Sequence, residues 1–365
     1  MEDYPVSQTA INTITAGRLG ADAIVKGQDD RLLVIVGPCS IHDTKAGLEY
    51  AKLLKAYADG AKDHLHILMR TYFEKPRTTI RASMAPFKST RVLGSQEDSY
   101  LNVYMTNYPD VLMIHLLLTT HASSFFLCRK YTSESYQAEL GIPVAVEFLD
   151  QISPQYIADT VSWGAIGART TESQCHRELA SGLSTPVGFK NGTNGSVGIA
   201  IDAIRAAKSG HVFLSVTKQG ISAIVETNVR QKWIQVFSHD VVENHIKECV
   251  QELSKAGLKP LVMVDCSHGN SEKKHERQLV VAEDLANQLE NPETQDSIMG
   301  VMIESNLVEG KQSLEALGPN KLAYGQSITD ACLDWESTKK ALDRLKAAVS
   351  QRRSQKLAAA SSGSA

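Results

Sequence analysis

Eight short apolar runs, several of them rich in β-branched residues, recur along this chain with helix-patterned segments between them. This alternation is typical of βα units, because neighbouring parallel strands need a long crossover that is usually a helix. The predicted strands are Leu32–Gly37, His64–Arg70, Pro143–Leu149, Trp163–Arg169, Thr185–Lys190, His211–Val216, Pro260–Cys266 and Ser297–Ser305. Eight such strands predict an α/β fold, a closed (β/α)8 TIM barrel, in preference to an open sheet.

The domain organisation follows from this count of strands. A length of 365 residues permits either one large barrel or two domains, and 42% hydrophobic residues suffice for a large core. Because the eight strands make one barrel, we expect a single domain over residues 1–350 with a short N-terminal extension. Residues 351–365 end in the low-complexity sequence AAASSGSA, which predicts a flexible tail.

Two segments do not fit the pattern. Residues 81–139 contain no clear βα unit, and residues 226–240 carry no clear turn chemistry. We expect both to be aberrant or locally disordered. The apolar run Val111–Cys128 has the length of a membrane span, but histidine and hydroxyl residues dilute it, so no membrane helix is expected.

Charge and cysteine usage restrict the partners and the compartment. Lys and Arg total 38 against 41 Asp and Glu, which lacks the basic excess of nucleic-acid-binding proteins. The six cysteines show no disulfide-framework spacing, and the N-terminus has no signal sequence. We therefore expect a cytoplasmic protein that binds neither nucleic acid nor membranes.

The chemistry is expected at the C-terminal ends of the strands, where barrels of this kind build their sites. A thiol, an imidazole and two carboxylates occur close to such ends: Cys39, His268, Glu304 and Asp330. Divalent transition metals accept such mixed S, N and O ligands. A buried Cys can instead be a small apolar residue, and a His a hydrogen-bonded polar group. Glu304 is harder to explain this way, because a carboxylate inside an apolar strand needs a partner or a metal.

Cationic residues gather near the same strand ends and indicate an anionic, phosphorylated substrate. They are Arg70, Lys75, Arg77, Arg169 and Lys190. Lys75 and Arg77 can alternatively be ordinary loop charges.

Nine motifs at or near these strand ends follow one another along the chain. They are GPCSIHD (37–43), MRTYFEKPRTT (69–79), VEFLD (146–150), WGAIGARTTESQ (163–174), GFKNGT (188–193), TKQG (217–220), VDCSHGNS (264–271), GVMIESNLVEG (300–310) and YGQSITDACLDWE (324–336). Together they resemble the type I 3-deoxy-D-arabino-heptulosonate 7-phosphate (DAHP) synthases. The resemblance implies condensation of phosphoenolpyruvate with D-erythrose 4-phosphate to DAHP and phosphate, the first step of the shikimate pathway to aromatic amino acids.

The resemblance also implies roles for individual residues. The ligands of one divalent metal ion (Mn, Fe, Co or Zn) are Cys39, His268, Glu304 and Asp330, and His268 also adjoins the substrates. The residues that bind phosphoenolpyruvate are Arg70, Arg169 and Lys190, and those that bind erythrose 4-phosphate are Lys75, Pro76, Arg77 and Thr78. The metal acts as a Lewis acid on the aldehyde oxygen, and Lys75 is the expected catalytic proton donor to the developing alkoxide.

Family members are usually homo-oligomers that an aromatic amino acid inhibits. The resemblance places this effector site at Pro154, Gln155, Ser184 and Ser215. Ser215 matches the phenylalanine-sensitive type better than the tyrosine-sensitive type.

The chain departs from the family pattern in the two irregular segments. After KPRTT it lacks the Gly-Trp-Lys-Gly-Leu stretch that closes over the substrates, and residues 226–239 lack the Arg-Gly-Gly turn that binds phosphoenolpyruvate phosphate. Loss of a charge-assisted phosphate contact weakens substrate binding. The alternative function is therefore a catalytically impaired paralogue that acts as a regulatory or binding subunit, or the product of a mis-joined coding sequence.

Overall fold

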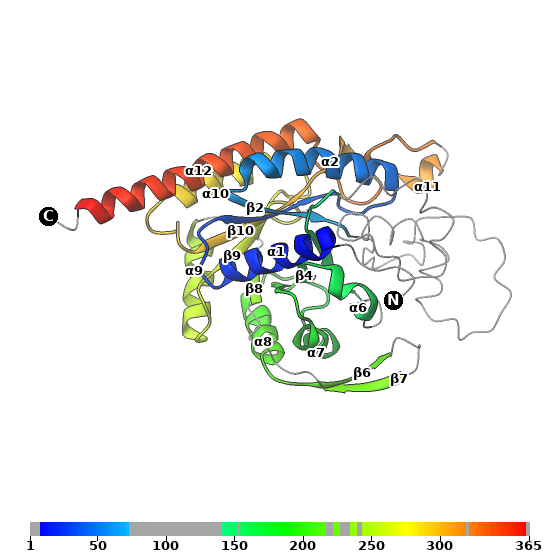
Figure 1. Ribbon diagram of the computed structural model, residues 1–365, viewed down its shortest axis with the longest axis horizontal. Helices are drawn as coiled ribbons and strands as arrows, with labels where there is room; N and C mark the ends of the chain where they lie inside the picture. Colours follow the sequence, from blue (N-terminus) through cyan, green and yellow to red (C-terminus); the bar gives the residue numbers. More distant parts are fainter. Residues whose placement is uncertain are drawn as a thin grey trace.

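The computed structural model describes residues 8–72, 140–149, 151, 154–216, 222–226, 234–238, 243–318 and 321–362. Its centre is a closed barrel of parallel strands (Figure 1), which confirms the predicted fold class. The barrel strands are β1 (Leu32–Gly37), β2 (Leu65–Arg70), β3 (Val144–Glu147), β4 (Trp163–Ile166), β5 (Val187–Lys190), β8 (Ile234–Ser238), β9 (Val262–Asp265) and β10 (Ile298–Glu304). The barrel closes because β1 pairs with both β2 and β10.

The sixth barrel strand is not the one that the sequence predicted. The run His211–Val216 instead supplies β6 (Val212–Val216), which pairs antiparallel with β7 (Ser222–Glu226) in a separate two-stranded sheet. The place beside β5 and β9 is taken by β8. The prediction for 211–216 was wrong because a hairpin strand and a barrel strand share the same local pattern, while pairing is decided over long distances. The expectation of disorder over 226–240 was likewise wrong for the five residues of β8.

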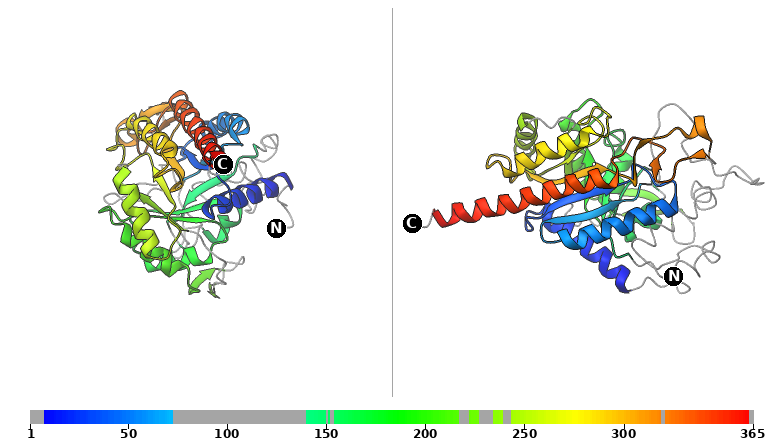
Figure 2. Two further views of the ribbon diagram at one scale, coloured as in Figure 1. Left: turned by 90° about the vertical axis from the view of Figure 1, so that its left-hand side faces the viewer. Right: turned by 90° about the horizontal axis from the view of Figure 1, so that it is seen from above.

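Helices surround the barrel (Figure 2). They are α1 (Gln8–Val25), α2 (Thr44–Ala61), α6 (Pro154–Ile157), α7 (Gln174–Gly182), α8 (Val197–Ala207), α9 (Glu243–Lys255), α10 (Arg277–Glu290), α11 (Leu314–Leu317) and α12 (Trp335–Ser362), with a 3-10 turn, η2 (Ala158–Thr160). Two short strands, β11 (Val308–Lys311) and β12 (Gln326–Ser327), pair outside the barrel. Asp43 caps α2 by accepting hydrogen bonds from the amides of Lys45 and Ala46.

The last helix runs further than expected. α12 continues to Ser362 and projects beyond the body of the barrel (Figures 1 and 2). The prediction of an unstructured tail from residue 351 was wrong over 351–362, because Gln, Arg, Lys, Leu and Ala in this segment are all good helix formers. Residues 363–365 lie outside the described part of the chain.

Two layers of apolar side chains form the core. Alternate residues of β1 illustrate them: Leu32 and Val34 face the surrounding helices, whereas Leu33 and Ile35 face the barrel interior. The interior layer includes residues from α1, among them Ile24. Because α1 packs into this layer beside the residues that lead into β1, the C-terminal ends of the strands form the opposite, polar end of the barrel.

No helix in the described part of the chain has the length and apolar character needed to cross a bilayer. The run Val111–Cys128 lies outside the described residues. The five cysteines that the structure describes form no disulfide, as expected from their spacing.

Candidate metal centre

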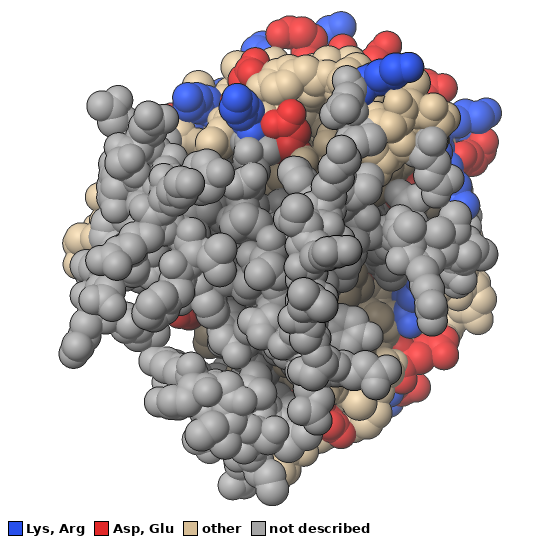
Figure 3. All heavy atoms as spheres, turned by 90° about the vertical axis from the view of Figure 1, so that its right-hand side faces the viewer, with Lys and Arg blue, Asp and Glu red and all other residues tan. Residues whose placement is uncertain are grey.

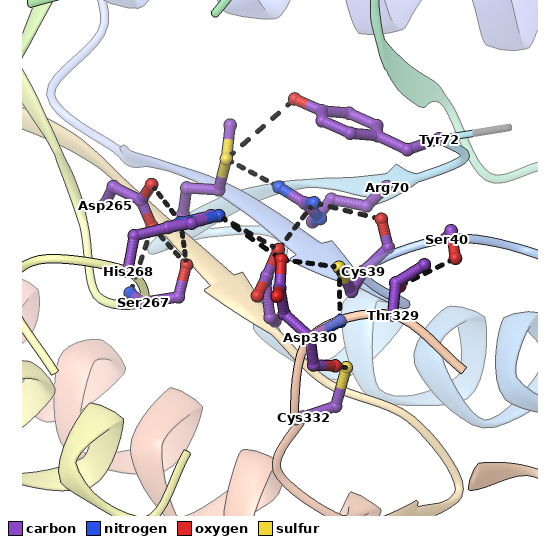
Figure 4. A network of polar contacts seen from close by, with 12 residues as sticks. Cys39, Ser40, Arg70, Tyr72, Asp265, Ser267, His268, Thr329, Asp330 and Cys332 are labelled. Carbon is purple, nitrogen blue, oxygen red and sulfur yellow. Dashed lines mark hydrogen bonds and ion pairs between the residues drawn. The ribbon is translucent and has the colours of Figure 1, made fainter. Parts of the chain in front are cut away.

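The four residues predicted to bind a metal converge at the C-terminal end of the barrel. Figure 4 labels three of them, Cys39, His268 and Asp330. One ligand atom each from Cys39, Glu304 and Asp330 lie within 4.8 Å of one another. The Nε2 atom of His268 lies 3.7 Å from Glu304 Oε1 and 4.0 Å from Asp330 Oδ2. Residues separated by more than 290 positions in the sequence therefore face a common point.

The donor set fits a divalent transition metal. It combines a thiol, an imidazole and two carboxylates, a mixture that such ions accept. Cys39 and Glu304 are buried, at 0% and 1% exposure, whereas the Asp330 side chain is 55% exposed. Two carboxylates this close repel each other unless a cation lies between them. The cluster thus offers a negatively charged cradle that is closed behind and open toward one side.

Short contacts hold Asp330 in place against the loop after β1. The Asp330 amide donates to Cys39 Sγ at 3.4 Å, and the Cys39 thiol lies 3.6 Å from Asp330 Oδ2. The hydroxyls of Ser40 and Thr329 lie 2.8 Å apart. Leu333 donates its amide to the Glu304 carbonyl at 2.9 Å, which ties the segment that carries Asp330 to the end of β10.

Arg70 lies behind the cluster with almost no exposure. Its Nη2 donates to Glu304 Oε1 at 3.1 Å, its Nε donates to the Pro38 carbonyl at 3.3 Å, and its guanidinium stacks 3.9 Å from the centre of the Tyr72 ring. Burial opposes the charge, but Tyr72 and Glu304 outweigh it and raise the pKa of Arg70. Arg70 therefore stays cationic and offsets part of the negative charge of the cluster.

Asp265 is part of this cluster's hydrogen-bond network, and the sequence analysis missed it. At the end of β9, its Oδ2 accepts hydrogen bonds from Lys190 Nζ at 2.5 Å and from His268 Nδ1 at 2.9 Å, while its Oδ1 accepts from the Ser267 amide and hydroxyl. Burial alone would raise the pKa of Asp265, but Lys190 and His268 hold it well below its usual range. A carboxylate bonded to Nδ1 leaves Nε2 of His268 free to face the other ligands. The sequence feature that could have identified Asp265 is its position as an acidic residue at the C-terminal end of an apolar strand.

The backbone also helps to place His268. Its φ is 56°, in the left-handed region that residues other than glycine rarely adopt. This turn takes the chain away from the direction of β9 and brings the imidazole over the cluster. Strained positions of this kind are common at functional sites.

The predicted substrate-binding residues are only partly covered by the structure. Lys190 ends β5 with its side chain 16% exposed, and Arg169 is exposed in the loop after β4. Lys75, Pro76, Arg77 and Thr78 lie outside the described residues, so their predicted roles stay predictions. Around the edge of the molecular face in Figure 3, side chains of both charge signs alternate without a large patch of one sign.

The elements α6, α7 and β6, which carry or adjoin the predicted effector residues, lie on one side of the barrel (Figure 1). Pro154 is buried at the start of α6, and Gln155 follows it. Ser184 lies between α7 and β5, where its Oγ accepts a hydrogen bond from Arg18 Nη1 at 3.3 Å. Ser215 is part of β6, which contacts α7. An effector site at these positions stays a prediction.

Comparisons with known proteins agree with this geometry. The model of the DAHP synthetase I family matches residues 3–98 and 115–343. The Phe-sensitive phospho-2-dehydro-3-deoxyheptonate aldolase of Escherichia coli (strain K12) is 47% identical over 358 residues, which span 97% of this chain and 93% of that protein. The tyrosine-inhibited aldolase of Schizosaccharomyces pombe is 44% identical over 361 residues, covering 96% of this chain and 89% of that protein.

A solved structure shows the same likeness in three dimensions. The phospho-2-dehydro-3-deoxyheptonate aldolase of Francisella tularensis matches with a TM-score of 0.79 and 40% identity, over 96% of this chain and 95% of that one. The likeness therefore extends over nearly the whole chain, including the ends of the barrel strands.

Proposed function

This chain belongs to the DAHP synthetase I family, and from that membership we propose the reaction that its barrel carries out. The chain is a 3-deoxy-7-phosphoheptulonate synthase, which condenses phosphoenolpyruvate with D-erythrose 4-phosphate to DAHP and phosphate, at the start of the shikimate pathway. The observation that carries the proposal is the convergence of Cys39, His268, Glu304 and Asp330 at one end of the barrel.

These four side chains would hold one divalent metal ion, with Mn, Fe, Co and Zn all compatible with the donor set. When bound, the ion supplies Lewis acidity toward the aldehyde oxygen of erythrose 4-phosphate. Asp265 keeps the Nδ1 proton of His268 away from the cluster, and Arg70 offsets the charge of Glu304. The protein thus fixes both the position and the charge of the site before substrates arrive.

Positive charge for the carboxylate and phosphate of phosphoenolpyruvate comes from Arg70, Arg169 and Lys190, while Lys75, Pro76, Arg77 and Thr78 bind erythrose 4-phosphate. C3 of phosphoenolpyruvate attacks the aldehyde carbon, whose oxygen becomes an alkoxide, and Lys75 donates a proton to that oxygen. Water then adds at C2, and the bond from C2 to the phosphate oxygen breaks to release inorganic phosphate.

We further propose feedback inhibition by an aromatic amino acid at Pro154, Gln155, Ser184 and Ser215, in a cytoplasmic homo-oligomer. Relatives of this chain carry the descriptions Phe-sensitive, tyrosine-inhibited and Trp-sensitive. The shared chemistry of these effectors is an amino acid with an aromatic ring.

Two observations bear on the residues 226–240 that lack the Arg-Gly-Gly turn. The second range matched by the family model runs through this segment, and β8 within it pairs with β5 and β9. Both support its membership of the barrel. The missing arginine is expected to raise the KM for phosphoenolpyruvate and leave the metal ligands unaffected.

The test is phosphate release from the purified chain with Mn²⁺ and both substrates. We expect release that requires erythrose 4-phosphate and stops on chelation of the metal, with Lys75→Met reducing kcat. Absence of turnover in a protein that still binds Mn²⁺ and an aromatic amino acid would reject the synthase in favour of an impaired regulatory paralogue. Near-full turnover by Lys75→Met would reject only the role of Lys75.

A further inference from the structure

The backbone of Glu304 stands at a break in the barrel ladder. β9 ends at Asp265, whose register partner on β10 is Met302, and the next bond of the ladder runs from the Cys266 amide to the Met302 carbonyl at 2.8 Å. Beyond this point the chain turns at His268 with a φ of 56°. Glu304 still pairs with Gly37 of β1, but the turn that aims the imidazole at the cluster leaves it without a pairing residue on the β9 side.

The side chain of Gln278 fills the vacated place. Gln278 lies in the first turn of α10 and is 1% exposed. Its Nε2 donates to the Glu304 carbonyl at 3.0 Å, and its Oε1 accepts from the Glu304 amide at 2.9 Å. A primary amide offers a donor and an acceptor side by side, as a peptide group does, so it can extend the ladder by one residue. Without it, the buried Glu304 amide would lose this partner, whereas the Glu304 carbonyl would keep the hydrogen bond from the Leu333 amide.

This pair of bonds fixes the residue whose carboxylate lies at the centre of the cluster. Glu304 Oε1 is 3.1 Å from Arg70 Nη2 and 3.7 Å from His268 Nε2, so a small rotation of the Glu304 backbone would move it away from both. Gln278 also lies in the first turn of the helix that follows the His268 loop. The amide therefore joins the segment that carries one candidate ligand to the strand that carries another.

We propose that Gln278 is a positioning residue of the metal centre, which acts through the main chain of Glu304 and sets the affinity of the site for its metal. This inference deepens the proposed function and rests on the metal site in it. Removal of partners that orient a ligand typically weakens metal binding about tenfold to hundredfold. We expect a loss of this size for Gln278→Met, which keeps the length of the side chain and removes both hydrogen bonds.

The matched control is Gln288→Met on the same helix. Gln288 is 4% exposed and donates to Asp284 on α10 at 2.6 Å, so its replacement also removes a buried amide. The experiment titrates Mn²⁺ into the metal-free proteins, follows free Mn²⁺ by electron paramagnetic resonance, and records the metal-free Tm of each. If the role of Gln278 is merely structural, Gln278→Met and Gln288→Met should lower Tm alike, and the Mn²⁺ Kd of both variants should stay near that of the parent.

We expect Gln278→Met to raise the Mn²⁺ Kd at least tenfold while Gln288→Met leaves it within twofold. Equal Kd values for Gln278→Met and the parent would overturn the inference. If Gln278→Met does not fold, Gln278→Asn keeps the amide but is one methylene too short to reach both groups, and the same two outcomes apply to it. A parent protein that binds no Mn²⁺ would instead count against the proposed function itself.

Discussion

Replacing Asp265 with Asn tests how the site is organised. Asp265 accepts hydrogen bonds from Lys190 and His268 on one oxygen and from Ser267 on the other. An Asn side chain keeps the shape but has no charge, and its single carbonyl oxygen cannot serve all of these donors. The change therefore loosens His268 and leaves the Lys190 ammonium without its carboxylate.

Two magnitudes follow from this geometry. Loss of the carboxylate behind a ligating His weakens metal binding about tenfold to hundredfold, which equals about 1.4–2.7 kcal/mol. Removing one partner of a buried ion pair costs about 3–5 kcal/mol of stability. Because the Lys190 side chain keeps 16% exposure, water relieves part of this cost, and we expect about 2–3 kcal/mol.

The assay combines Mn²⁺ titration with urea unfolding of the metal-free protein. The control is Asp296→Asn, since the Asp296 side chain is 69% exposed in its ion pair with Lys356 and such pairs contribute at most about 1 kcal/mol. Asp265→Asn should lose both metal affinity and stability, whereas Asp296→Asn should lose neither measurably. A parental Mn²⁺ Kd in Asp265→Asn would refute the role of Asp265 in placing His268.

Three further predictions concern the pH response, the barrel packing and substrate binding. Burial lowers the pKa of His66, so its contribution to stability is complete above its unfolded pKa of about 6.5 and is lost as the pH falls below it. Tm should therefore fall less between about pH 7 and 5 in His66→Gln than in the parent, and parallel curves would contradict this. In Gly300→Ala the new Cβ would lie 2.7 Å from the Leu33 carbonyl oxygen. We therefore expect the free energy of unfolding, measured with urea, to fall by about 1–3 kcal/mol. Gly198→Ala, in the open first turn of α8, should not lower it. Lys190→Met should raise the KM for phosphoenolpyruvate about tenfold or more and change the KM for erythrose 4-phosphate little. An unchanged KM for phosphoenolpyruvate would exclude Lys190 from binding this substrate.

Local sequence patterns were sufficient for most of the barrel. β1 begins and ends where its apolar run does, and the other correctly assigned strands fall inside their predicted runs. The run His211–Val216 was misplaced because nothing in its own residues distinguishes a hairpin from a barrel strand. The place between β5 and β9 in the barrel is occupied by β8, which comes from a segment without a clear sequence pattern. The run His211–Val216 therefore forms a strand outside the barrel.

The site was predictable where chemistry is concentrated in single side chains. Cys39, His268, Glu304 and Asp330 stood out as polar groups near the ends of apolar strands, and the structure brings them together. Asp265 and Gln278 were missed because their roles depend on partners that only the fold supplies. Asp265 acts through His268 and Lys190, and the Gln278 side chain acts through hydrogen bonds to the backbone of Glu304.

The proposed metal site requires Cys39 and three other side chains to bind one ion at the end of the barrel. Substitution with Co²⁺ tests it directly, because a thiolate that binds Co²⁺ gives a charge-transfer band in the near ultraviolet. Cys332, also buried and two residues after Asp330, provides the control. We predict one Co²⁺ per chain, with a thiolate band that is lost in Cys39→Ser and retained in Cys332→Ser. A parent protein without the band, or a band that survives in Cys39→Ser, would show that Cys39 is not a ligand of this metal.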